Sequence, residues 1–83
     1  MTQKIEIDTV KMFRGDLNEY SRWNVENAAR AILARPEERE IALMVYDIHR
    51  RILENSGYNS ENLKEADDKL VRLVKDGTKV RLN

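Results

Sequence analysis

Histidine, serine and the carboxylates are the side chains of this chain that could take part in catalysis or metal binding. His49 is the single histidine, and cysteine is absent. A zinc site would therefore need three carboxylates around His49, which is an unusual set of ligands. Ser21, Ser56 and Ser60 have no catalytic motif beside them, and a nucleophilic serine needs a base that a third group orients. The sequence predicts no metal site and no cofactor.

The paired acidic residues do not form an acid–base pair either. Glu37 and Glu38 are adjacent in the sequence, and so are Asp67 and Asp68. Neighbouring side chains on a helix point about 100° apart, so such a pair cannot work together on one substrate. The three glycines are isolated, so they make no phosphate-binding loop. We therefore expect that the protein is not an enzyme.

Length and charge limit the remaining classes of function. The 83 residues correspond to a single domain, 1–83. Fifteen basic residues balance fifteen acidic ones, and zero net charge disfavours nucleic-acid binding, which depends on phosphate neutralisation. No apolar run approaches the ~18 residues that a membrane span needs, and the N-terminus lacks a signal-peptide core. We expect a cytoplasmic protein that does not enter a membrane.

Helical patterns fill most of the chain. Asp16-Leu-Asn-Glu19 is a capping box, in which the Asp16 carboxylate accepts a backbone N–H three residues later. It predicts a first helix that runs to about Arg35, because Pro36 disfavours helical geometry in the residue before it.

Two further helices follow from the same kind of signal. Pro36 suits the first position of a second helix, which runs to about Asn55 and stops at Gly57. Asn62-Leu-Lys-Glu65 is another capping box, and it predicts a third helix that ends before Gly77.

Both ends of the chain have the pattern of strands. Residues 4–8 and 78–82 alternate between apolar and polar side chains, which is typical of half-buried strands. If they paired, acidic side chains of the first would oppose basic ones of the second. The alternative is that both ends are frayed tails. The predicted fold class is mainly α: a three-helix bundle with short strand-like N- and C-terminal segments that could pair.

The second helix has the widest apolar arc. Its predicted core stripe consists of Ile41, Met44, Val45, Ile48 and Ile52. Ala42, Tyr46 and Leu53 widen this arc to over half of the circumference, which predicts a central helix that touches both others. His49 falls inside the arc, where it could pair with Asp67 of the third helix. Leu43 falls outside it.

Trp23 is the only tryptophan, and it lies about 140° from Ala28 around the first helix. If the helix is continuous, the indole projects outward and is an anchor for a partner, contributing little to the monomer. The alternative is a break near Ser21 or Asn24, which would turn the indole into the core.

These patterns favour a small non-enzymatic interaction module, acting as an inhibitor, adaptor or regulatory subunit, that binds a protein partner and self-associates as a homo-oligomer. The candidate interface residues are Trp23, Leu43, Met12, Arg30, Arg39 and Arg50. The alternative is a small nucleic-acid-binding regulator that uses arginines of the second helix and a basic C-terminal patch. That patch consists of Lys69, Arg72, Lys75, Lys79 and Arg81.

Overall fold

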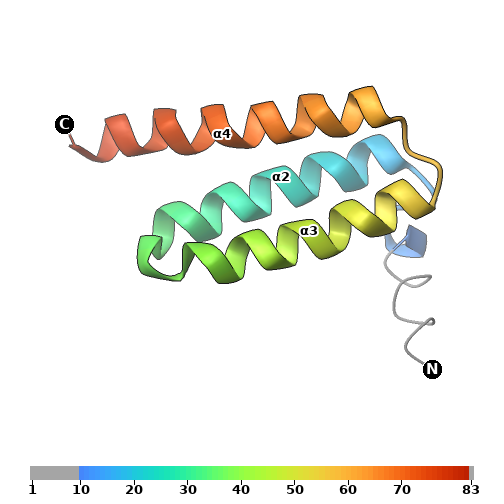
Figure 1. Cartoon of the computed structure of the whole chain (residues 1–83), viewed down its shortest axis with the longest axis horizontal. Coiled ribbons are helices and arrows are strands. Elements are labelled where there is room, and N and C mark those ends of the chain that lie inside the picture. Colours follow the sequence, from blue (N-terminus) through green and yellow to red (C-terminus); the bar gives the residue numbers. More distant parts are fainter. Residues whose placement is uncertain (1–9, 83) are drawn as a thin grey trace.

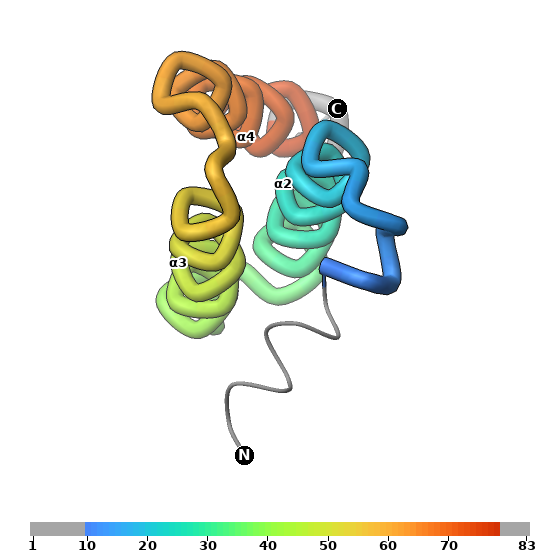
Figure 2. Tube along the Cα trace, turned by 90° about the vertical axis from the view of Figure 1, so that its right-hand side faces the viewer, coloured from blue at the N-terminus to red at the C-terminus, as the bar shows by residue number. Residues whose placement is uncertain are grey.

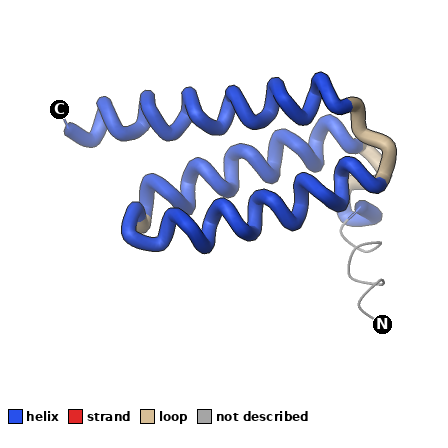
Figure 3. Tube along the Cα trace, in the orientation of Figure 1, coloured by secondary structure: helices blue, strands red, loops and turns tan. Residues whose placement is uncertain are grey.

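The structure is a computed structural model that describes residues 10–82, with side chains for residues 10–78. Its body consists of three long helices (Figure 1): α2 (Leu17–Ala34), α3 (Arg39–Asn55) and α4 (Ser60–Leu82). A 3-10 turn, η1 (Pro36–Glu38), joins α2 to α3. Pro36 therefore begins this turn, and the prediction that it is the first residue of the second helix is wrong. Across the described residues there is no strand (Figure 3), which confirms the prediction of a mainly α helical bundle.

The central helix is α2, not α3 as the apolar arc predicts. In Figure 1, α2 lies between α4 and α3, and it packs extensively against both. The helices α3 and α4 lie on neighbouring sides of α2 (Figure 2) and contact each other much less. One buried cluster is made by Val25, Ala28, Ala29, Tyr46 and Leu70. The other is made by Tyr20, Ile52, Leu53 and Leu63.

The ends of α2 follow the sequence signals. The Asp16 side chain accepts a hydrogen bond of 3.1 Å from the backbone N–H of Glu19, so Asp16 caps the helix as predicted. At the other end, Arg35 leaves helical geometry immediately before Pro36. The helix continues without a break through Ser21 and Asn24, which excludes the alternative in which a break turns Trp23 inward.

Both ends of α4 differ from the prediction. Gly57 ends the preceding helix with a φ of 96°, and the side chain of Asn59 then accepts the backbone N–H of Glu61 at 2.7 Å. The capping residue is therefore Asn59 and not Asn62. At the other end, α4 continues past Gly77 to Leu82, so the predicted C-terminal strand at residues 78–82 is wrong. The predicted N-terminal strand, residues 4–8, lies outside the described residues.

Gly77 has a packing role rather than a stop role. A Cβ atom at this position would overlap Cδ1 of Leu33, because the end of the Leu33 side chain of α2 lies directly over Gly77. A glycine inside a helix costs ~1 kcal/mol relative to alanine, but a larger residue here would have to displace the Leu33 side chain.

Filling this contact should destabilise the fold. We expect Gly77→Leu to lower the free energy of unfolding by ~1 kcal/mol or more, because the cost of displacing the Leu33 side chain exceeds the ~1 kcal/mol of helix propensity that leucine regains. The control is Lys75→Leu, at an exposed position of the same helix. Urea unfolding followed by circular dichroism measures both. Equal midpoints for the two variants would contradict the packing role.

Candidate protein-docking face

One face of α3 carries large aliphatic side chains that remain open to water. The exposed fractions are 60% for Ile41, 64% for Met44, 44% for Val45 and 54% for Ile48. Their spacing places all four on one side of the helix. We call these four residues the aliphatic stripe. The sequence predicts them as core, and this prediction is wrong for all of them; of the predicted core stripe, only Ile52 is buried.

The opposite side of α3 faces the bundle. Tyr46 and Leu53 are buried there, and Tyr46 lies roughly 150° around the helix from the aliphatic stripe. The bundle thus accepts the side of the wide apolar arc that also carries hydrogen-bonding groups. The side with only aliphatic groups is left outside.

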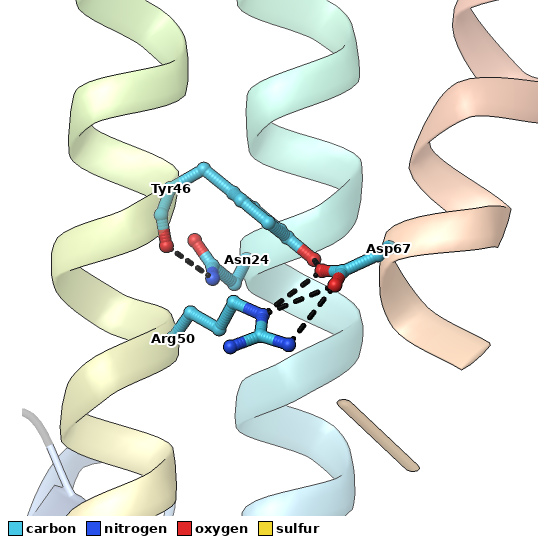
Figure 4. Close-up of polar contacts among 4 residues, drawn as sticks. All are labelled: Asn24, Tyr46, Arg50 and Asp67. Atoms are coloured by element: carbon cyan, nitrogen blue, oxygen red, sulfur yellow. Dashed lines mark hydrogen bonds and ion pairs between the residues drawn. The ribbon is translucent and has the colours of Figure 1, made fainter. Parts of the chain in front are cut away.

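A carboxylate on α4 holds the inward side of α3 (Figure 4). The Tyr46 hydroxyl donates to Oδ1 of Asp67 at 2.7 Å. The Arg50 guanidinium donates to the same carboxylate from Nε at 3.1 Å and from its terminal amine at 3.0 Å. Burial and the neighbouring Asp67 carboxylate both raise the pKa of Tyr46, so its hydroxyl remains a donor. We call Tyr46, Arg50 and Asp67 the Asp67 cluster.

A buried amide fixes α3 against α2 at the same level. Asn24 is buried, and its side-chain amide donates to the backbone carbonyl of Tyr46 at 3.1 Å (Figure 4). Every buried side-chain polar atom of the described residues has a hydrogen-bond partner. Since breaking such a bond leaves an unpaired buried group, α3 is held in one rotation relative to its neighbours.

The predicted pair of His49 and Asp67 does not form. Nδ1 of His49 is hydrogen bonded to the hydroxyl of Tyr20 at 2.7 Å. Residues four apart share a helix face, so Tyr46 and Arg50 reach α4 together. The side chain of His49 points about 100° away from that of Arg50 around the helix, so it meets α2 and not α4.

The Trp23 side chain is neither fully exposed, as an outward-facing anchor would be, nor fully buried in the core. The indole is 36% exposed, and it contacts His49 edge to face with ring centroids 5.1 Å apart. It also packs against Phe13 at 5.5 Å and Tyr20 at 6.1 Å. Trp23 therefore packs within the monomer at the junction of α2 and α3, contrary to the expectation that it contributes little there. Its contact with a partner stays a prediction.

A groove between α2 and α3 adjoins the aliphatic stripe. Its volume is about 290 Å³, and its walls include Ala28, Ala31 and Ala34 of α2. Ile41 and Val45 belong both to the stripe and to the groove, so the two features form one surface. Ala31 and Ala34 are exposed, whereas Ala28 is buried at the base of the groove. We call the stripe together with Ala31 and Ala34 the docking face. The groove is lined by α2, η1 and α3 without α4, so this face lies on the side away from α4.

Charged residues border the docking face unevenly. Glu37, Glu38 and Glu40 are exposed at the N-terminal end of α3. Near the other end, Arg51 is exposed and forms an ion pair of 3.0 Å with Asp47. One end of the stripe therefore carries exposed glutamates, of which Glu38 pairs with Arg35, whereas the other end carries the Arg51–Asp47 ion pair.

The remaining interface candidates do not join the docking face. Leu43 is exposed as predicted, at 40%, but it lies on another side of α3. Arg50 is bound to Asp67 and is not free to act as an interface residue in this conformation. Arg30, Arg39 and Met12 are exposed.

The predicted basic patch is only partly within the described side chains. Lys69, Arg72 and Lys75 are exposed on α4, whereas the side chains of Lys79 and Arg81 lie outside the described set. Lys69 and Arg72 line a shallow groove between α2 and α4 together with acidic Glu65 and Asp68 of α4. The surface that the structure describes here has mixed charge.

The described residues contain no group of three or more histidine, cysteine, aspartate or glutamate side chains that could hold a metal ion. Within the same part of the chain, no helix is both long enough and apolar enough to cross a membrane. No protein-family model matches the sequence, and neither a curated protein nor a solved structure is significantly similar to it.

Removing the negative charge of Asp67 should destabilise the bundle. We expect Asp67→Asn to cost ~1–3 kcal/mol in free energy of unfolding, because two partly buried donors lose a charged acceptor. Asp47→Asn is the control, since it breaks only the more exposed ion pair with Arg51. Chemical unfolding compares them, and an equal effect would count against the role of the cluster.

The stability of the fold should depend on the ionisation of His49. Burial lowers the pKa of His49 below its ordinary value of 6.5, so the unfolded chain takes up the proton first. This contribution is complete above the unfolded pKa and is lost as the pH falls toward the folded pKa. We expect the melting temperature to fall from about pH 7.5 to about pH 5, and to fall less in His49→Gln. Identical pH profiles would refute the assignment.

Proposed function

We propose that the chain is a small non-enzymatic protein–protein interaction module, acting as an inhibitor, adaptor or regulatory subunit, and that it binds through the docking face. The observation that supports this most directly is the exposed aliphatic stripe on α3. A contiguous apolar patch of a few hundred Å² with a charged border is typical of an interaction site. A cytoplasmic location, as expected from the sequence, is part of the proposal.

The energetic argument rests on the side chains of the stripe. Burying apolar surface contributes about 25 cal/mol per Å², so covering a few hundred Å² is worth several kcal/mol before the cost of association. Ile48 and Ile41 are branched and stand on a rigid helix, so they lose little freedom when they become buried. The groove beside them accepts side chains of the partner.

The geometry suits an elongated helical partner. Two adjacent helices with a groove between them receive the apolar face of a third helix through anchors at helical spacing. On the α2 side the wall includes three alanines beside Asn24 and Asn27, and the small alanine side chains allow a partner backbone to approach closely. The charged border contributes orientation and specificity rather than most of the affinity.

Capture experiments with surface variants test this function. The variants are Ile48→Asp on the docking face and Val71→Asp on α4, whose side chains are matched in exposure at 54% and 53%. The immobilised full chain and both variants are incubated with extract of the native host, and bound proteins are identified by mass spectrometry. We expect the wild-type chain and Val71→Asp to retain the same protein, and Ile48→Asp to lose it.

The salt dependence of binding distinguishes the nucleic-acid alternative. Binding through apolar surface persists when salt is raised, whereas binding to phosphates weakens steeply. Retention that is equal in all three chains, or that consists of salt-sensitive nucleic acid, would contradict the proposed function.

A further inference from the structure

We infer that the docking face is occupied by a second copy of this chain, with the two α3 helices antiparallel across a twofold axis. This inference rests on the proposed function, because it names the protein that the face binds. It is supported by the shape of the face, by the area available and by the distribution of charge along α3.

The area argument favours a partner that covers both helices. The aliphatic stripe exposes a few hundred Å² of mostly apolar surface. A stable interface buries about 800 Å² on each side, so the stripe alone is too small and the α2 side of the groove must contribute. A partner must therefore contact α2 as well as α3, as one helix laid along the groove with a second helix beside it does. A second copy presents such a pair of helices.

The stripe is suited to pairing with itself. In a twofold interface, the same patch is used on both copies, so its centre must meet its own centre. The stripe extends evenly to either side of Met44 and Val45. With antiparallel helices, Ile41 of one copy lies opposite Ile48 of the other, and the aliphatic side chains cover each other along the whole stripe.

Charge selects the antiparallel direction. Glu37 and Glu40 are exposed at the N-terminal end of α3, whereas Glu38 pairs with Arg35 at 3.6 Å. At the other end of the stripe, Arg51 pairs with Asp47 of its own helix. Parallel pairing would bring Glu37 and Glu40 to their own counterparts, where like charges repel, and antiparallel pairing keeps them apart. The helix dipoles favour the same arrangement.

The resulting dimer leaves α4 on the outside. The docking face lies on the side away from α4, because α4 lines no part of the groove and holds Tyr46 on the opposite side of α3. Two α2–α3 layers can therefore pack face to face without a clash from α4. The four helices of the two layers form a bundle at the centre of the dimer, which is a stable way for amphipathic helices to bury their apolar sides.

Sedimentation equilibrium of the full chain tests whether a second copy occupies the docking face. We expect a dimer for the wild type, an unchanged dimer for Val71→Asp, and a dissociation constant raised ~30-fold or more for Ile48→Asp. Position 48 is exposed, so Ile48→Asp should keep its helical circular dichroism and report on association rather than folding.

Disulfide cross-linking tests the direction of the helices. The chain contains no cysteine, so each single substitution introduces the only thiol. We expect Met44→Cys, near the axis, to form an intermolecular disulfide under mild oxidation. Asn55→Cys lies on the same side of α3, but antiparallel pairing separates its two copies by roughly 30 Å, so it should not cross-link.

The outcomes separate this inference from the function on which it rests. A monomeric wild type, a dimer unaffected by Ile48→Asp, or cross-linking of Asn55→Cys as efficient as that of Met44→Cys would each overturn the inference. If the wild type is monomeric but Ile48→Asp still abolishes capture of a host protein, the function stands and only the second copy is excluded. If capture is equal in all chains, the function itself fails.

Discussion

The hydrogen bonds from Tyr46 and Arg50 to the Asp67 carboxylate decide how α3 is rotated in this protein. Both donors lie on one side of α3, and both need a partner when they are covered by the bundle. A carboxylate on α4 supplies it, and the amide of Asn24 holds the same level of α3 from α2. Turning α3 to bury its aliphatic side would break these bonds, and an unpaired buried polar group costs ~1–3 kcal/mol.

The rest of the packing follows from this rotation. Because α3 offers α4 mainly the Asp67 cluster, the two helices touch little, and the apolar contacts of the bundle converge on α2. Leu70 of α4 completes one of the two buried clusters around α2, and Leu63 of α4 completes the other. Gly77 then lets the last part of α4 stay close to α2 at Leu33.

A chain of this length buries only somewhat over ~60% of the surface of its unfolded form. The monomer buries apolar side chains mainly around α2 and leaves the aliphatic stripe of α3 exposed to water. The bundle folds without burying the stripe. The exposed side chains of the stripe can therefore contribute free energy of binding when a partner buries them. A partner that covers the docking face would finish the burial that three helices cannot achieve alone.

The sequence by itself determined the three helices and several of their ends, because capping and proline effects act within a few residues. Asp16 and Gly57 act as predicted, and Pro36 ends the first helix as predicted but begins a 3-10 turn instead of α3. Only the tertiary structure decided which side of α3 is buried, because its apolar arc is so wide that two rotations satisfy the local pattern. The bond between Tyr46 and Asp67 joins residues far apart in sequence, so no local signal shows it. The contact that leaves room only for glycine at position 77 is likewise made by a residue of another helix, Leu33.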